Sequence, residues 1–173
     1  MKNIERESKA FVPVLKAAEA VADEVWKRVS QWPVFPRDTV GKQLVRASDS
    51  IGANIAESFG RFHYSEKIQF LYYARGSLFE TKYWLNRAQQ RALMPELEVE
   101  GLSSQLTDLA RQLNAFVASL RTQRTANGRR DSGLKEEEGV YLTLEEAAAA
   151  PPLFAEAELD WLISNLPSPI PNR

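Results

Sequence analysis

Long segments of this sequence repeat apolar residues every three or four positions, which is the spacing of one face of an α-helix. The clearest stripe lies in residues 96–124 and consists of Leu102, Leu106, Leu109, Leu113, Phe116, Val117 and Leu120. Comparable stripes predict helices over residues 12–30, 38–59 and 65–93. No segment alternates as a half-buried β-strand would. We therefore predict an all-α fold, and four long amphipathic helices with short connections are typical of an antiparallel up-and-down four-helix bundle.

Prolines, glycines and one serine suggest where these helices begin and end. Pro13 is expected in the first turn of the first helix, where its missing N–H needs no partner. The second helix follows Pro36 and ends at Gly60. Ser65 is the expected N-cap of the third helix, because its hydroxyl can accept a bond from a free backbone N–H.

The residue types present exclude several kinds of chemistry. Cysteine is absent, so disulfides, thiolate metal sites and cysteine nucleophiles are impossible. His63 is the only histidine, which excludes zinc sites built from histidine and cysteine and the paired Glu-x-x-His di-iron site of some bundles. No glycine-rich phosphate-binding motif occurs. We expect a protein that is not an enzyme, needs no cofactor or metal, and resides in the cytoplasm rather than in a membrane.

Charge is distributed unevenly along the chain. Residues 1–133 carry 20 basic and 15 acidic side chains, a net of +5, whereas residues 134–173 carry 2 and 8, a net of −6. A basic body with an acidic tail is consistent with a polyanionic partner. An alternative is a mixed surface that charge keeps soluble.

The composition changes after residue 124, and we divide the chain there. Residues 1–124 are the predicted bundle, 125–142 a flexible linker, and 143–173 an acidic C-terminal extension with short helices, opened by a capping box of Thr143 and Glu146. One helical face of this extension is apolar and would dock on a partner or pack as a fifth helix on its own bundle; its members are Phe154, Ala157, Trp161, Leu162 and Leu166.

The second predicted helix has one face made almost entirely of small residues, namely Gly52, Ala53, Ala56 and Gly60. Two glycines cost a helix about 2 kcal/mol relative to alanine, so we expect close packing of another helix against this face as compensation. Asn54 is expected to bond across to another helix, and Glu57 to pair with Arg61 four residues later. We assign these residues to helix packing or oligomer contacts. The third helix spreads its apolar residues widely, which also indicates an oligomer interface.

Basic residues gather near the ends of the second and third predicted helices. The candidates for nucleic-acid binding are Arg37, Lys42, Arg46, Arg61, Lys67, Arg87 and Arg91. Such a surface would bind phosphates with little sequence preference and steep salt dependence. Phe62, His63 and Tyr64 could stack on bases of a single strand.

Residues 11–122 resemble a known family. Phe35–Pro36, followed by "QLVRAS", "SIGANIAESFGR" and "FLYYARGSLFE" in that order, is similar to the four-helix-bundle proteins encoded within 23S rRNA intervening sequences. The accessory variability determinant of diversity-generating retroelements belongs to the same group. The resemblance implies an antiparallel four-helix bundle and a ring-shaped homopentamer, and it brings no catalytic residues. The acidic tail lies outside the usual length of the family.

Two functions remain open at this point. The resemblance implies a non-enzymatic, homo-oligomeric accessory or scaffold protein, a ring of five subunits that binds RNA or DNA without sequence specificity, together with a reverse transcriptase as its protein partner. The alternative is a protein-interaction module whose acidic C-terminal helix recruits a protein partner without touching nucleic acid.

Overall fold

A computed structural model describes residues 2–128 and 151–164, with side chains for residues 9–122 and 151–163. Every element in these two ranges is helical, so the predicted all-α class is confirmed for them. The elements in chain order are α1 (Lys2–Val29), α2 (Val34–Pro36), η1 (Arg37–Gly41), α3 (Lys42–Gly60), α4 (Tyr64–Gln90), α5 (Glu96–Gly128) and α7 (Glu156–Ser164).

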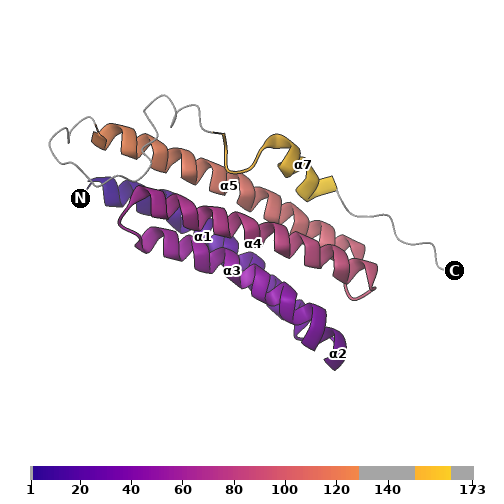
Figure 1. Cartoon of the computed structure of the whole chain (residues 1–173). Coiled ribbons are helices and arrows are strands. Elements are labelled where there is room, and N and C mark those ends of the chain that lie inside the picture. Colours follow the sequence, from indigo (N-terminus) through magenta and orange to yellow (C-terminus); the bar gives the residue numbers. More distant parts are fainter. Residues whose placement is uncertain (1, 129–150, 165–173) are drawn as a thin grey trace.

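The four long helices lie lengthwise beside one another and share one hydrophobic core (Figure 1). α1 contacts α3 and α5, and α4 also contacts α3 and α5. Each helix turns the apolar stripe of its sequence toward this core, and every member of the α5 stripe is buried. The fully buried leucines and isoleucines of the other stripes include Leu44, Ile51, Ile55, Leu71, Leu78 and Leu85. The predicted core faces of α3, α4 and α5 are therefore confirmed, and that of α1 is confirmed except at Trp26.

The first helix begins ten residues earlier than predicted, at Lys2 rather than near residue 12. Pro13 consequently lies inside α1, and its predicted place in the first turn is wrong. Phe11 supplies the reason, because its ring stacks on Phe59 of α3 at 4.2 Å between centroids and also approaches Phe116 of α5 at 6.3 Å. These contacts, which the sequence pattern did not reveal, hold the chain helical on the N-terminal side of the proline.

The first turn of the second predicted helix is π-helical, because η1 extends to Gly41 and α3 begins at Lys42, and η1 packs tightly against α1. A Cβ on Gly41 would lie 2.5 Å from Cγ1 of Val29 and 3.3 Å from the Trp32 ring. Only glycine permits this approach of the η1 backbone to the end of α1. The segment matters because π-helical turns are rare and often accompany functional sites.

The ends of α4 differ from the predicted ones. Its N-cap is His63, which makes no side-chain capping bond, so Ser65 lies in the first turn and is not the N-cap. At the C-terminal end the helix stops at Gln90 because Ala92 adopts a left-handed conformation with φ 54°. The N–H of Leu93 donates to the Ala88 carbonyl at 2.9 Å, and the N–H of Ala92 donates to the Gln89 carbonyl at 2.9 Å. This is the Schellman arrangement, here formed without glycine.

The C-terminal residues 151–164 pack on the same molecule. α7 contacts α5, and α5 itself continues to Gly128, four residues beyond its predicted end. Leu153, Phe154, Leu159 and Leu162 are buried by this contact. Thr143 and Glu146, the predicted capping box, lie outside the described residues. In the helices that the structure describes, none combines the length and apolar character that crossing a membrane requires.

Candidate functional site

A groove of about 960 Å³ opens between α1, η1 and α3. Most of its wall is apolar, and charged side chains stand among the apolar ones. Its lining residues are Trp26, Val29, Ser30, Arg37, Asp38, Gly41, Lys42, Val45, Arg46, Asp49, Ser50 and Ala53. Three of the seven residues predicted to bind nucleic acid therefore line one concave surface.

Trp26 is the largest apolar side chain of the groove, and sequence reasoning misplaced it. By its spacing, Trp26 belongs to the apolar stripe predicted for residues 12–30, which would place it in the core, yet the residue is 63% exposed. The buried positions of α1 are Val14, Ala18, Val21, Val25 and Val29, which form a complete stripe without it. Residue 26 lies at the edge of that stripe on the helix, and this position was the sequence feature that could have indicated its exposure.

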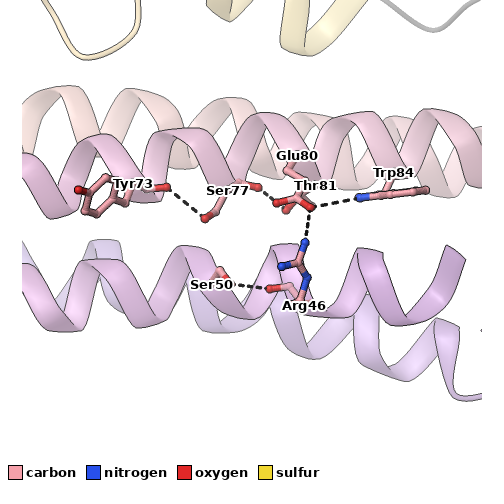
Figure 2. Close-up of polar contacts among 7 residues, drawn as sticks. All are labelled: Arg46, Ser50, Tyr73, Ser77, Glu80, Thr81 and Trp84. Carbon is pink, nitrogen blue, oxygen red and sulfur yellow. Dashed lines mark hydrogen bonds and ion pairs between the residues drawn. The ribbon is translucent and has the colours of Figure 1, made fainter. Parts of the chain in front are cut away.

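The three basic side chains of the groove differ in their partners. Arg37 pairs with its neighbour Asp38, with 3.4 Å from Nε to Oδ1. Arg46 donates from Nη2 to Oε1 of Glu80 on α4 at 2.8 Å, and Nε1 of Trp84 donates to the same oxygen at 3.5 Å (Figure 2). Lys42 is exposed and, in the part of the chain described, has no ion-pair partner. Lys42 is thus the cation most available to an external anion.

Carboxylates oppose these cations. Asp38 and Asp49 both line the groove. Burial, and secondarily the nearby carboxylate of Asp23, raises the pKa of Asp49 above its ordinary value. The carboxylate of Asp49 would repel a phosphate placed in the groove.

The remaining predicted binding residues divide between the two ends of the helices. α4 contacts η1, and the Arg46–Glu80 pair aligns the second half of α4 with the start of α3, so Arg87 and Arg91 lie at the groove end. Arg61 and Lys67 lie at the other end of α3, which is 19 residues or about 28 Å long. The structure therefore brings three of the seven together in the groove, places Arg87 and Arg91 on α4 toward the same end of the helices, and separates the other two.

At the far end, each predicted cation is occupied by a neighbour. Arg61 pairs with Glu57, which confirms that predicted ion pair, and its guanidinium lies 4.6 Å from the centre of the Phe70 ring. Nζ of Lys67 lies 5.8 Å from the centre of the Phe59 ring. Phe62, beside them in the turn, is 87% exposed. This end offers an exposed aromatic ring and cations that are already engaged.

The small-residue face of α3 is mostly exposed, contrary to the expectation of a close helix–helix seam within the protein. Gly52 faces Ala18 of α1, and a Cβ on Gly52 would lie 3.8 Å from that of Ala18. Ala53, Ala56 and Gly60 are exposed, and nothing lies within 4 Å of a Cβ built on Gly60. Packing against this face therefore stays a prediction about contacts between molecules.

Asn54 does not bond across to another helix, as was predicted. Its Nδ2 donates to the Ser50 carbonyl of the same helix at 2.7 Å. The side chain of an asparagine in a helix can easily donate to the carbonyl one turn back. Because this local hydrogen bond satisfies the amide, Asn54 needs no partner on another helix.

By their spacing, Lys82 and Arg75 flank the core stripe of the third predicted helix, and pairing with carboxylates is the ordinary expectation for such residues. Arg75 does pair, with Glu158 of α7. Lys82 is instead fully buried, and its Nζ donates to Oγ of Ser103 on α5 at 2.8 Å. Burial lowers the pKa of Lys82 to about 8. No feature of the sequence around Lys82 indicated that its side chain would be buried without a carboxylate as its partner.

The predicted docking face of the tail is used within the molecule. Phe154 and Leu162 are buried, Trp161 is partly buried, and Leu166 lies outside the described residues. Ala157 is exposed, whereas Leu153 and Leu159 are buried. The face was misassigned because Phe154 precedes α7, so a helical projection from it does not apply. The ring centroids of Phe154 and Trp161 lie 5.7 and 5.6 Å from that of Phe79. These contacts cover part of the apolar surface of α4 that we had assigned to an oligomer interface.

Comparison with known proteins supports the resemblance noted in the sequence. Residues 12–115, more than half of the chain, match the family model described as 23S rRNA-intervening sequence protein. No curated protein and no solved structure matches the chain.

Proposed function

The chain belongs to the 23S rRNA-intervening sequence protein family, and on that premise we propose that it is a non-enzymatic accessory protein that binds nucleic acid. In this proposal α1, α3, α4 and α5 form an antiparallel four-helix bundle that assembles into a ring of five. A reverse transcriptase is the proposed protein partner.

The observation that carries the proposal is that Arg37, Lys42 and Arg46 line one groove, with Arg87 and Arg91 on α4 toward the same end of the helices. Lys42 supplies an available positive charge, and the exposed ring of Trp26 supplies a surface on which a base can stack. Cations bind the backbone of any sequence, and an aromatic ring accepts any base. The combination suits single-stranded nucleic acid bound without sequence preference.

Self-association would strengthen this weak site. The protein carries a nearly balanced charge overall, so one copy attracts a polyanion only modestly. In a symmetric ring each groove is repeated around the axis, and several grooves can hold one strand together. The exposed small residues Ala53, Ala56 and Gly60 support such an assembly, because they allow another helix to approach α3 closely.

The binding proposal is tested by fluorescence anisotropy with a labelled single-stranded RNA over a range of salt concentrations. Affinity should fall steeply with salt, and Lys42→Gln should reduce the slope of log affinity against log salt by about 0.7 to 1. Lys16→Gln is the matched control, because Lys16 is an exposed lysine of α1 outside the groove. Equal effects of the two substitutions, or affinity independent of salt, would refute the proposed interface.

The assembly proposal has a separate test. Ala56→Leu places a bulky side chain on the small-residue face and should shift the mass measured by light scattering toward a single protomer. Ala118→Leu, on an exposed position of α5, is the control for the added bulk. A wild-type protein that is monomeric at all concentrations would contradict the ring.

A further inference from the structure

The C-terminal residues 151–163 are held on α4 and α5 by hydrogen bonds to their backbone and by contacts with their side chains. Asn114 of α5 makes two hydrogen bonds to Phe154: Nδ2 donates to the Phe154 carbonyl at 2.8 Å, and Oδ1 accepts from the Phe154 N–H at 2.7 Å. Arg121 donates from Nη1 to the Pro151 carbonyl at 3.0 Å. The extended stretch before α7 is therefore fixed in register by side chains of one helix.

Side chains of the segment occupy a matching surface. The ring of Phe79 on α4 lies between those of Phe154 and Trp161. The Arg75 guanidinium, which pairs with Glu158, lies 4.9 Å from the centre of the Phe79 ring and 5.7 Å from that of Phe154. Oε2 of Glu158 also accepts from the Ala155 N–H at 2.9 Å and so caps the start of α7. Apolar anchors, one ion pair and a backbone clamp together form a recognition site for a short peptide.

Chain connectivity does not restrict this segment to its own molecule. Residues 129–150 join it to α5, and 22 residues can span up to about 70 Å when extended. The 33-residue helix α5, the longest element described, measures about 50 Å. The preference for the protein's own site is set by the effective concentration that this connection imposes, so docking on a second copy should increase as the protein concentration rises.

We propose that residues 151–164 form an exchangeable arm that docks on the α4–α5 face of a second copy of this chain. The arm makes the same contacts there, with Asn114, Arg75 and Phe79 supplied by the second copy. Exchange of an identical segment creates no new interface and leaves no surface uncovered, so its equilibrium cost is small.

Charge is also compatible with a second copy as the occupant, because the body that attracts the tail is the same in every copy. Residues 1–133 have a net charge of +5 and residues 134–173 a net of −6, so the tail of one copy is attracted to the body of another. The arm itself contributes Glu156, Glu158 and Asp160 and no basic residue. This proposal does not depend on nucleic-acid binding, and it is tested with the protein alone.

The test is site-specific cross-linking in the full chain, which has no native cysteine. Ala118→Cys lies on α5 between Asn114 and Arg121, and Ala155→Cys directly follows Phe154; both positions are exposed. The two single variants, one carrying a mass tag, are mixed, incubated at several concentrations and treated with a flexible bismaleimide. A mixed, cross-linked dimer should form in a yield that rises with concentration. The double variant in one chain reports docking within a molecule.

Two controls make the result specific. Lys42→Cys replaces Ala118→Cys in a matched mixture, because Lys42 is exposed but lies on the groove side of the molecule. Adding Asn114→Ala to the Ala118→Cys chain should lower the mixed yield severalfold while helicity is unchanged. The proposal is overturned if the double variant links within the chain and the mixture gives no mixed dimer. It is also overturned if the Lys42→Cys mixture links equally well.

Discussion

Replacing Lys82 by methionine should stabilise this protein at neutral pH. Lys82 lies between the buried residues Leu78 and Leu85 on α4, and its side chain is completely buried. Among the described residues its one hydrogen-bond partner is Ser103, whose own hydroxyl donates to the Val99 carbonyl at 2.7 Å. Methionine has a similar length and no charge, and Ser103 keeps its bond to Val99. The substitution therefore removes a buried charge and leaves no unsatisfied donor.

The magnitude follows from the pKa of Lys82. Burial lowers that pKa from 10.5 to about 8, and this difference corresponds to about 3 kcal/mol of preference for the neutral form. Below pH 8 the lysine is charged in both the folded and unfolded states, so the folded state bears the whole cost. Between pH 8 and 10.5 the unfolded chain binds more protons than the folded one, so stability rises with pH. Lys82→Met should gain about 2–3 kcal/mol at pH 7, and the gain should shrink toward pH 10.

Urea unfolding followed by circular dichroism between pH 7 and pH 10 measures this effect. The free energy of unfolding of the wild type should climb toward that of Lys82→Met as the pH rises. Lys42→Met is the control, because Lys42 is exposed and its replacement should give a difference that does not vary with pH. The reasoning is refuted if the wild-type and Lys82→Met curves run parallel, or if Lys82→Met is less stable at pH 7.

Four further substitutions test other parts of the structure. Ala92→Gly should raise the free energy of unfolding by about 1 kcal/mol in urea melts, because glycine adopts the left-handed conformation at the end of α4 without the strain that alanine has there. A loss of stability would contradict the Schellman geometry. Gly41→Ala should lower the melting temperature, because its methyl group would collide with Val29. Gly76→Ala should raise the melting temperature, because nothing lies within 4 Å of a Cβ at that position and alanine favours a helix more than glycine does. Equal shifts would refute the close packing of η1. Asp49→Asn should tighten RNA binding in anisotropy titrations by removing a repulsive charge from the groove, and unchanged affinity would place the RNA elsewhere.

The sequence predicted the core of this protein well because apolar periodicity reports directly which face of a helix is buried. The stripes containing Leu44, Leu78 and Leu106 are buried as expected. The family also followed from the sequence, since the ordered motifs between residues 35 and 80 lie within the matched range. Helix ends were less predictable, as Pro13 and Ser65 illustrate, because contacts from other helices outweighed local preferences.

The candidate sites depended on more than the sequence. Basic residues could be identified by type, but only the alignment of α4 against α3 decided that Arg87 lies toward the same end of the helices as Lys42 and that Arg61 lies at the other end. Trp26 became a groove residue because five other positions of α1 completed the buried stripe.

By itself, the sequence determined the helical class, the buried faces and the family, because each depends on residue spacing along one chain. Tertiary structure alone decided that Lys82 is buried beside a serine, that the small residues of α3 face outward, and that Asn114 holds the C-terminal segment. The physical reason is that these features depend on distances between side chains far apart in the sequence. Such distances are fixed only when the helices pack together.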